Sequence, residues 1–413
     1  MHEAPKLPIS NLAICFVTSL NPRSNALISS KKKMRIEIIG AGPGGLYFAI
    51  LAKKRFPDWD IHINERNGRN DTFGWGVVFS DRTLEHLREE DDISAARIIQ
   101  AFETWENVDV VHKNEHIIIG GNKFSGISRL AMLNILEDRA EELGVRLGFH
   151  NEIRDVAEFH SADLIIFADG VNSFFRKRYE QYFQPEISVR PNKYIWYGTN
   201  QLFNALTLTV RKNNDGIFAS HSYKFNKTTS TFVVECDPET WSRAGFEKMS
   251  DPETRTYLEN VFKNDLGGHS LLSNKSVWIN FQLIKNRHWV HENMLIIGDA
   301  AHTAHFSIGS GTKLALEDAI ALIRSLEKET AVTNALKDYE TTRKPIVEEY
   351  QSFAYDSLLL FEHLGDYMDL EPIEMAYKMM TRSKRLDREK LRKRDPEFVS
   401  SVEQYWSANK SNY

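Results

Sequence analysis

A cluster of glycines near the start of the chain has the spacing needed to bind phosphate groups. The pattern G-x-G-x-x-G is formed by Gly40, Ala41, Gly42, Pro43, Gly44 and Gly45. In this pattern Gly40 permits a tight turn, Gly42 lets the backbone approach a pyrophosphate, and Gly45 lets a helix pack closely on a strand. The free N–H groups at the start of that helix would face the phosphates. The pattern predicts a dinucleotide site without deciding between NAD and FAD.

The residues on either side of the glycines predict the strand–helix–strand unit that such a site requires. Residues 35–39 form a β-branched run, residues 44–55 have a small-residue helical pattern, and residues 61–64 form a second apolar run. Glu65 ends that run, at the distance where an acidic side chain is expected to bind a ribose hydroxyl. We count Arg66, the next residue, among the candidate cofactor contacts. This order of elements is typical of a parallel sheet and favours a bound dinucleotide over a glycine-rich turn without a ligand.

Two further motifs follow apolar runs later in the chain. One run leads into Asp169 and Gly170, which we call the DG motif, and another leads into Gly298 and Asp299, which we call the GD motif. A glycine-bearing turn at 308–311 follows and precedes a predicted helix. Because the N-terminus of a helix stabilises negative charge, this turn is a candidate for contact with an anionic group.

The order of these three motifs resembles that of the FAD-dependent aromatic hydroxylases of the p-hydroxybenzoate hydroxylase type. The resemblance implies that Asp299 binds the ribityl chain of FAD and that Arg129 lies near this chain and the pyrophosphate. It also implies that the DG motif shapes the contacts with both FAD and NAD(P)H, and that the glycine-bearing turn faces the flavin pyrimidine ring. The further cofactor contacts that it implies are Asp169, Gly170, Gly309, Ser310 and Gly311.

Several segments resemble a narrower group within this family. They match the monooxygenase part of salicylyl-CoA 5-hydroxylase and 2-aminobenzoyl-CoA monooxygenase, and in the middle of the chain the indole monooxygenase of violacein biosynthesis. Together they cover essentially all of 34–400. Members with a second, reductase-like barrel continue beyond the length of this chain, so ring reduction is expected to be absent. The matching segments are 74–81, 192–199, 230–236, 305–319 and 381–399.

The resemblance implies a single-component flavin monooxygenase. Such an enzyme hydroxylates an electron-rich aromatic ring, here of the salicylyl-CoA or 2-aminobenzoyl-CoA type, with NADH or NADPH and O2 through a flavin hydroperoxide. The partners would be a small aromatic substrate, with a CoA ester as one option, and O2, and the protein would be a monomer or homodimer. Three alternatives remain: a hydroxylase of an indole or tryptophan-derived intermediate, an FAD-linked reductase without oxygen insertion, and a flavin-bound regulatory protein.

Two residues after the GD motif are candidate catalytic groups. His305 is expected beside the flavin, where an imidazole would accept a proton from a ring hydroxyl or amino group. The alternative is a histidine that packs against FAD. Lys313 at a helix start opposes the helix dipole, which indicates a ligand or an acidic partner, with an exposed lysine as the alternative. In the segment 74–81, Trp75 and Gly76 are candidate cofactor contacts, although a tryptophan is more often a core residue.

The middle and the end of the chain hold further candidates. The block 190–286 consists of short runs typical of antiparallel strands, separated by turn residues, and we expect it to form the substrate site. The stretch 382–394 holds eight Lys or Arg residues and two acidic residues, and it either binds the phosphates of CoA or forms a solvated helix face. Candidate wall residues in the strand block are Tyr197, Phe218, His221 and Tyr223.

Composition excludes several classes of protein. The 52 Lys and Arg residues and 57 Asp and Glu residues give a net charge of −5, which argues against a nucleic-acid-binding protein. No apolar run is long enough to span a membrane. Only two cysteines occur, so we expect neither a disulfide framework nor a metal site, and a reducing, cytoplasmic location.

We expect an α/β fold with a discontinuous, Rossmann-like FAD-binding domain, an antiparallel-sheet substrate domain and C-terminal helices. The FAD-binding domain is assigned to 34–110, 111–189 and 287–345, and apolar runs at 116–119, 164–167 and 294–297 are expected to be its later strands. The substrate domain is assigned to 190–286, and a helical segment, with breaks at Pro345, Pro372 and Pro396, to 346–413. Residues 1–33 are expected to be a disordered leader that activity does not require, with a signal sequence as the alternative.

Overall fold

The strand–turn–helix–strand unit is present in the computed structural model, which describes residues 33–409. Strand β1 (Arg35–Ile39) runs into helix α2 (Pro43–Arg55), which returns to β2 (Asp60–Asn64), and the two strands pair in parallel. The expected leader therefore lies outside the described residues, except for Lys33.

A six-stranded sheet surrounds this unit. Its order is β16-β17-β9-β1-β2-β8, and every pair is parallel except β16 with β17. The four added strands come from distant parts of the chain, as expected for a discontinuous cofactor domain. They are β8 (Arg146–Gly148), β9 (Leu164–Phe167), β16 (Val290–His291) and β17 (Met294–Ile296).

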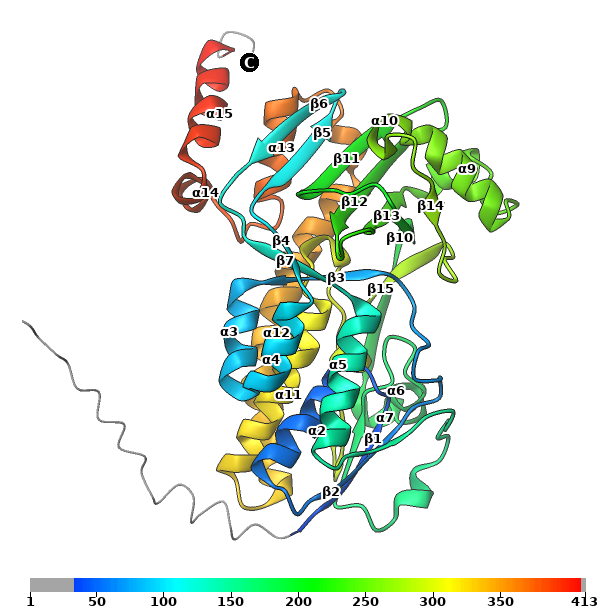
Figure 1. The fold of residues 1–413 in the computed structure, drawn as a ribbon, viewed down its shortest axis with the longest axis vertical. Coiled ribbons are helices and arrows are strands. Elements are labelled where there is room, and N and C mark those ends of the chain that lie inside the picture. Colours follow the sequence, from blue (N-terminus) through cyan, green and yellow to red (C-terminus); the bar gives the residue numbers. More distant parts are fainter. Residues whose placement is uncertain (1–32, 410–413) are drawn as a thin grey trace, which may run out of the picture. The chain divides into compact units, whose positions relative to one another are not determined.

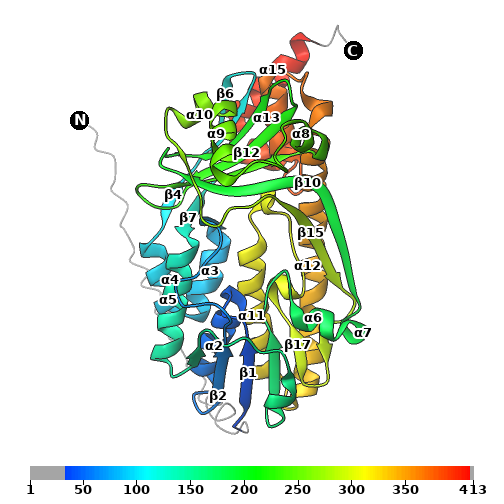
Figure 2. The same ribbon diagram turned by 90° about the vertical axis from the view of Figure 1, so that its right-hand side faces the viewer.

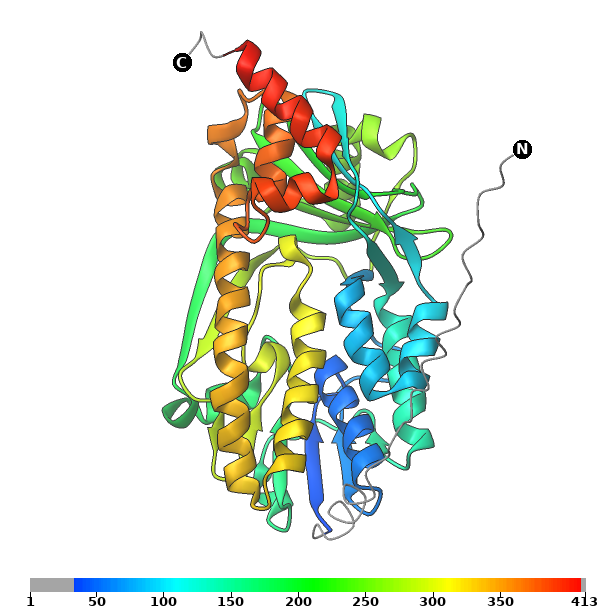
Figure 3. The same cartoon turned by 90° about the vertical axis from the view of Figure 1, so that its left-hand side faces the viewer.

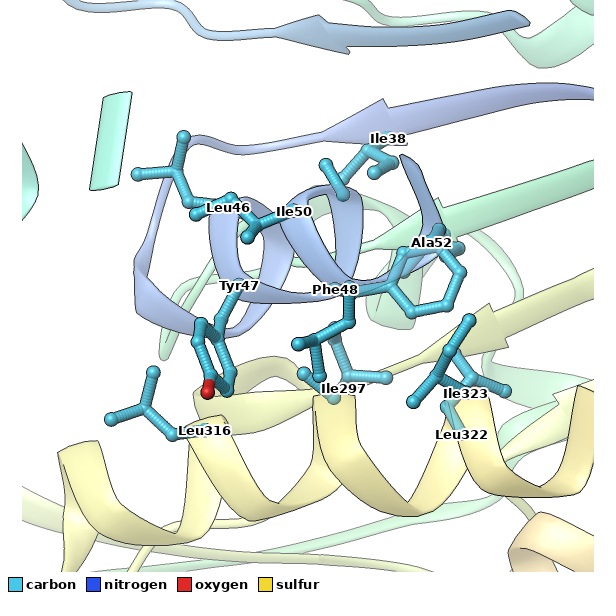
Figure 4. Packing of buried hydrophobic residues seen from close by; sticks show 14 of the residues in the cluster. Ile38, Leu46, Tyr47, Phe48, Ile50, Ala52, Ile297, Leu316, Leu322 and Ile323 are labelled. Atoms are coloured by element: carbon cyan, nitrogen blue, oxygen red, sulfur yellow. The ribbon is translucent and has the colours of Figure 1, made fainter. Parts of the chain in front are cut away.

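Helix α2 is buried on all sides, because the sheet lies on one side of it and helices pack on the other. Tyr47 and Phe48 of α2 point toward Leu316 and Ile323 of α11 (Gly311–Lys328), as Figure 4 shows. The long helix α12 (Val332–Glu362) runs beside α11 (Figure 3), and α5 (Arg129–Glu142) lies on the other flank of α2. This packing fixes the N-termini of α2 and α11 relative to the ends of the strands.

A second, eight-stranded sheet lies beyond the carboxyl ends of the parallel strands (Figure 1). Its path is β14-β10-β13-β12-β11-β5-β6, with β15 also paired to β10. The strands expected between 190 and 286 are confirmed, and β10 extends from this sheet toward α7 (Glu180–Phe183) (Figure 2). The strands are β5 (Val108–His112), β6 (Glu115–Ile119), β10 (Pro185–Thr199), β11 (Leu206–Lys212), β12 (Ile217–Lys224), β13 (Ser230–Cys236), β14 (Leu271–Leu272) and β15 (Ile279–Asn286).

One strand lies in a different sheet from the one expected. The run 116–119 was assigned to the cofactor sheet, but it forms part of β6, which pairs with β5 as a hairpin, and β5 pairs in parallel with β11. An apolar run shows that a strand is buried, but it does not show which sheet buries it. The tight turn at Lys113 and Asn114, both with positive φ, keeps β6 beside β5.

A small three-stranded sheet joins the two larger ones. Its order is β3-β7-β4, and two helices lie between β3 and β4 along the chain, the second of which packs on α5. These elements are β3 (Gly76–Ser80), α3 (Asp81–Glu90), α4 (Asp92–Gln100), β4 (Glu103–Trp105) and β7 (Phe124–Ser128).

The C-terminal region is helical, as expected, with one difference. Helices α13 (Pro372–Thr381) and α15 (Pro396–Ala408) each begin at a proline, where the missing N–H costs nothing. Pro345, however, lies inside α12 and does not end it. Buried side chains on both sides of it, Arg343 and Val347, hold the helix together, so tertiary packing overrides the local preference of proline.

The remaining helices connect these layers. These helices are Val156–Phe159, α6 (Phe174–Arg178), α8 (Pro238–Arg243), α9 (Asp251–Val261), α10 (Lys263–Leu266), Gly298–Ala300, Phe306–Ile308, Leu364–Tyr367 and α14 (Arg388–Arg394).

No helix within 33–409 is long and apolar enough to cross a membrane.

Candidate active site

A cavity of about 1800 Å³ is lined by residues of the eight-stranded sheet and by residues that directly follow the carboxyl ends of β9 and β17 in the six-stranded sheet. Pockets for single small ligands usually measure about 300–1,000 Å³, so this cavity has room for a dinucleotide together with a second ligand. One end is formed by the glycine-rich turn and the N-terminus of α11, and the other by β12, β13 and the C-terminal helices. Ligands of open parallel sheets bind at this edge, beyond the carboxyl ends of the strands.

The glycine-rich turn has the geometry that its sequence predicts. Gly40 has φ +105°, and a Cβ there would lie 2.3 Å from the carbonyl oxygen of Ala168. A Cβ on Gly45 would lie 2.6 Å from the carbonyl oxygen of Gly40, so both glycines allow close approaches within the protein. Gly42, Pro43 and Gly44 instead line the cavity.

Two helix N-termini face this end of the cavity without a side-chain cap. Neither Gly42 at the start of α2 nor Ser310 at the start of α11 caps its helix with a side-chain hydrogen bond. Gly309, Ser310 and Gly311 line the cavity, and a Cβ on Gly311 would meet nothing within 4 Å. Free N–H groups at two helix starts favour an anionic or acceptor-rich ligand, and the residues therefore fit FAD.

Asp299 and Arg129 place opposite charges at the same end of the cavity. Both residues line it, and Asp299 is exposed to its interior. Desolvation by the surrounding protein raises the pKa of the Asp299 carboxyl, whereas the charge of Arg129 lowers it. Desolvation lowers the pKa of Arg129, and Asp299 opposes this effect. A carboxylate and a guanidinium in one recess suit a ligand with both hydroxyl and phosphate groups.

The DG motif is tied to the GD motif by Arg176. Its guanidinium donates hydrogen bonds to the carbonyl oxygens of Ala300 (3.0 Å) and Val171 (2.6 Å). The Asp169 carboxylate accepts from the N–H of Phe174 at 2.8 Å and so caps α6, and it does not line the cavity. Gly170 does line it, and Asp169 acts on the cavity by shaping that turn.

Four other predicted cofactor contacts differ in position. Gly76 lines the cavity, whereas Glu65, Arg66 and Trp75 are not among its lining residues. Glu65 accepts hydrogen bonds from the N–H groups of Ala41 (2.9 Å) and Asn67 (2.8 Å), so its carboxylate is bound to the glycine turn.

Arg66 is exposed, and the ring of Trp75 packs 6.3 Å from that of Phe225. The structure thus gives Trp75 a packing position, and contacts of Glu65 and Arg66 with a cofactor stay predictions.

Lys313 has an acidic partner and is not an exposed lysine. It is 7% exposed, its ammonium lies 2.6 Å from Glu317, and it lies 4.2 Å from the ring centre of Tyr350. Lys313, Glu317 and Tyr350 all line the cavity, so this pair is available to a ligand.

His305 is buried behind the cavity wall. It is 2% exposed and is not among the lining residues. Its Nδ1 lies 2.8 Å from the hydroxyl of Ser307, and its Nε2 lies 3.9 Å from Glu235. Burial lowers the pKa of His305 to about 4, so the ring is neutral at pH 7. Direct contact between His305 and a substrate stays a prediction that this position does not favour.

Of the candidate wall residues in the sheet, two line the cavity. His221 and Tyr223 do so, whereas Phe218 and Tyr197 lie in the core on the far side of the sheet. The sequence analysis missed Glu235, which is 2% exposed and faces both His221 and His305. A single acidic residue in the otherwise uncharged strand Ser230–Cys236 was the available signal.

A second buried cluster supports the GD motif. Asp318 accepts hydrogen bonds from the N–H of Gly298 (3.0 Å) and from Arg343 Nε (2.8 Å), and His302 Nε2 lies 2.7 Å from its carboxylate. His302 therefore has a structural position in this cluster. Asp318 and Arg343 were not singled out from the sequence, because their partners come from different turns of the chain.

The basic stretch 382–394 does not form one solvated helix. It comprises the turn that follows α13 and helix α14, and five of its basic residues line the cavity, namely Arg382 and the four cations named below. Within 33–409, neither Arg385 nor Arg394 forms an ion pair with a carboxylate; Arg394 donates instead to Asn122 at 2.9 Å. Desolvation and the nearby charge of Arg385 lower the pKa of Arg394. We call Lys384, Arg385, Lys390 and Arg394 the basic mouth.

Comparison with known proteins establishes the class. Residues 33–354 match the FAD binding domain family, and the chain belongs to this family. The fold is also that of the tetrameric form of 2-methyl-3-hydroxypyridine-5-carboxylic acid oxygenase, with a TM-score of 0.68 and 20% identity over 88% of this chain and 96% of that one.

Three relatives are similar over most of their length. Salicyloyl-CoA 5-hydroxylase of Streptomyces sp. is 40% identical over 90% of this chain and 74% of the relative. Protodeoxyviolaceinate monooxygenase of Chromobacterium violaceum is 34% identical over 86% of this chain and 95% of the relative. The 3-hydroxy-4-methyl-anthranilyl-[aryl-carrier protein] 5-monooxygenase of Streptosporangium sibiricum is 34% identical over 81% of this chain and 90% of the relative.

The chain is an FAD-dependent aromatic monooxygenase that takes its electrons from NAD(P)H. This confirms the enzyme class and the cofactors that the motifs predicted.

Proposed function

We propose that the chain hydroxylates an electron-rich aromatic acyl group carried as a thioester on a phosphate-bearing arm, of the salicylyl-CoA or 2-aminobenzoyl-CoA type. The names of two relatives support this class, since one is a salicyloyl-CoA hydroxylase and the other acts on an anthranilyl group of a carrier protein. The observation in this chain that carries the proposal is the basic mouth.

The basic mouth is suited to phosphates because two of its cations lack an acidic partner among the residues that the structure describes. Arg385 lies 5.1 Å from the ring centre of Tyr350, and Arg394 is held by Asn122. Two like charges without a carboxylate between them repel each other, and an anion would relieve this repulsion. The phosphates of a CoA thioester supply such an anion, while the aromatic acyl group reaches the interior of the same cavity.

The residues of the chain bind both reactants and exclude water. The free N–H groups of α2 and α11, with Asp299 and Arg129, would hold FAD, which when bound supplies electron transfer from NAD(P)H and the activation of O2. Tyr194, Phe306 and Trp196 line the interior, and the rings of Tyr194 and Phe306 lie 4.6 Å apart. These aromatic rings would fix the orientation of the substrate ring and keep water away from it.

An indole-derived substrate is the second candidate, supported by the violacein-pathway relative and the aromatic lining of the cavity. Such a substrate carries no CoA phosphates. The proposed location is the cytoplasm, and the oligomeric state stays a prediction of a monomer or homodimer.

A substrate panel tests the proposal. Purified protein loaded with FAD is given salicyloyl-CoA, 2-aminobenzoyl-CoA, the two free acids and indole, with NAD(P)H and ¹⁸O2. We expect a mass gain of one labelled oxygen with the CoA thioesters. A labelled product from indole alone would support the second candidate, and NAD(P)H oxidation without any labelled product would contradict both.

Charge reversal tests the basic mouth directly. We expect the double variant Arg385→Glu and Arg394→Glu to raise KM for salicyloyl-CoA at least about tenfold, because charge-assisted hydrogen bonds to phosphate are worth about 1.5–3 kcal/mol each. KM for the N-acetylcysteamine thioester, which has no phosphate, should not change. Lys393→Glu is the matched control, since Lys393 is exposed and is not among the lining residues. Equal effects on both thioesters would contradict the proposal.

A further inference from the structure

We propose that His221, backed by Glu235, is the group that takes the proton from the hydroxyl or amino substituent of the substrate ring. This inference rests on the proposed function, because it requires a ring with a protonated donor group. It replaces His305 in that role and assigns His305 to the support of Glu235.

His221 and His86 are the histidines within 33–409 that line the cavity, and His221 is the one in the eight-stranded sheet. It lies in the centre of β12, is 4% exposed and lines the cavity. Its ring packs edge-on against Phe306 at 5.4 Å and at a tilt against Phe361 at 4.7 Å between ring centres. These two contacts from different elements hold the imidazole in one orientation beside the aromatic rings that would enclose a substrate.

Glu235 lies behind His221, and one of its carboxylate oxygens accepts no hydrogen bond from the described part of the chain. Asn192 donates a hydrogen bond to Oε1 at 2.9 Å, which holds the carboxylate in place. The other oxygen, Oε2, lies 3.8 Å from Nε2 of His221, and neither of these buried atoms has a hydrogen-bond partner within 33–409. Buried polar atoms without partners are uncommon, and they accumulate where a ligand or a proton completes the network.

The arrangement defines where the proton goes. With its hydrogen on Nε2, which faces Glu235, the neutral His221 ring keeps a lone pair on Nδ1. When the O–H or N–H bond of the substrate breaks, its electron pair stays on the substrate atom and the proton binds to that lone pair. The carboxylate of Glu235 then faces an imidazolium and stabilises its charge. The electron-rich ring that results is the form that accepts electrophilic oxygen.

His305 cannot play the same part from its position. Its Nδ1 is occupied by the Ser307 hydroxyl, and its Nε2 faces Glu235 at 3.9 Å. Ser307 in turn contacts Ser357, whose hydroxyl accepts from Arg382 at 2.9 Å. His305 is therefore a positioning residue on the far side of Glu235.

The charged and titratable groups around His221 agree with this assignment. Burial lowers the pKa of His221, and Glu235 opposes that effect, so the ring is neutral and able to accept a proton at pH 7. Burial would raise the pKa of Glu235, but His221, His305 and Asn192 lower it overall. The other groups that act on this cluster are Tyr194, Arg382 and Arg190, the last paired with Glu362.

A pair of probes separates proton transfer from packing. Salicyloyl-CoA has a phenol that must lose its proton, whereas its methyl ether, 2-methoxybenzoyl-CoA, has an electron-donating oxygen without one. A general base contributes about 10²–10⁴-fold to a rate. We expect His221→Gln to lower coupled hydroxylation of salicyloyl-CoA by that factor and to leave the rate with the methyl ether within about threefold. Glu235→Gln should act in the same direction, and His305→Asn less than either.

Two controls accompany these variants. FAD content and melting temperature show whether each variant is folded, and His363→Gln, at an exposed histidine that is not among the lining residues, should match the wild type with both probes. An equal loss with both probes, or no loss with either, would overturn the proposal. A wild-type protein that oxidises neither probe would contradict the proposed function instead.

A binding measurement tests the inference without turnover. The absorbance of bound salicyloyl-CoA reports ionisation of its phenol in the oxidised enzyme as pH is varied. In the wild type this ionisation should occur at least one pH unit lower than in His221→Gln. If both proteins bind the probe and ionise it at the same pH, His221 does not take the proton and the proposal is wrong.

Discussion

Two buried histidine–carboxylate clusters each contribute a residue to the cavity wall, and they differ in how completely their atoms are bonded. In the cluster of His302, Asp318 and Arg343, the Asp318 carboxylate has three contacts of 2.7–3.0 Å. In the cluster of His221, Glu235 and His305, both histidines lie 3.8–3.9 Å from the carboxylate. We call the first cluster saturated, because its carboxylate forms close hydrogen bonds with all of these neighbours, and the second unsaturated, because its histidines lie beyond hydrogen-bond distance of the carboxylate.

The difference indicates two kinds of task. The bonds of Asp318 fix the N–H of Gly298, and through it the turn that presents Asp299 to the cavity. A saturated network of this kind makes a rigid scaffold for a cofactor. Glu235 and His221 instead each keep a buried polar atom beside the cavity that has no hydrogen-bond partner within 33–409, which is useful only where a proton or ligand completes the network.

Removal of the Asp318 carboxylate should have the largest effect on stability. Asp318→Ala removes the closer of the two carboxylates that pair with buried Arg343 and leaves only Glu317, at 3.2 Å, and breaking a buried pair in this way costs about 3–5 kcal/mol. Chemical denaturation of the wild type and the variant measures this difference. Asp138→Ala is the matched control, because Asp138 is 62% exposed and pairs with Arg69 at the surface, where such pairs are worth at most about 1 kcal/mol. Similar losses in both variants would contradict a scaffold role for Asp318.

The carboxylate of Asp299, which the Asp318 cluster holds toward the cavity, should contribute to FAD binding. Asp299→Ala should weaken FAD binding by about 1.5–3 kcal/mol through the loss of a charge-assisted hydrogen bond, and Asp299→Asn by less, because the amide oxygen still accepts. Titration of the apoprotein with FAD, followed by flavin fluorescence, gives the dissociation constants. Unchanged affinity in the alanine variant would mean that Asp299 does not contact FAD.

The saturated cluster of Asp318 should also make the free energy of unfolding depend on pH under acidic conditions. Burial would raise the pKa of Asp318, but His302 and Arg343 lower it to about 2, compared with about 3.9 in an unfolded chain. A lowered pKa stabilises the fold above pH 4, and this contribution of about 2–3 kcal/mol is lost as the pH falls from 4 toward 2. The stability difference between the wild type and Asp318→Asn should therefore shrink over that interval. A difference independent of pH would show that the Asp318 charge is not involved.

The unsaturated cluster should contribute least to stability. Glu235→Gln keeps the hydrogen bond from Asn192 and breaks no close ion pair, so the free energy of unfolding should change by less than about 1 kcal/mol. Thermal melting of the variant beside Asp318→Asn makes the comparison. A loss of several kcal/mol in Glu235→Gln would show that both clusters are scaffolds and would remove the contrast between them.

The cofactor end of the molecule was predictable from the sequence, and the substrate end was much less so. The glycine spacing predicted the positions of Gly40, Gly42 and Gly45, because each depends on backbone within a few residues or on the neighbouring strand. His305 was singled out by its distance from the GD motif, yet distance along the chain does not tell which way a side chain points. Glu235 gave only the weak signal of one acid in an apolar strand.

The sequence by itself determined the parallel sheet, the uncapped helix starts and the motif order that identifies a flavin enzyme, because these depend on local geometry and on short spacings. Only the tertiary structure decided that β6 joins the large sheet, that Pro345 continues α12, and that the turn after α13 and helix α14 bring cations to the cavity. It also decided that His221, and not His305, reaches the cavity. These outcomes depend on the packing of elements that lie far apart in the chain, and neither composition nor periodicity specifies which buried faces meet.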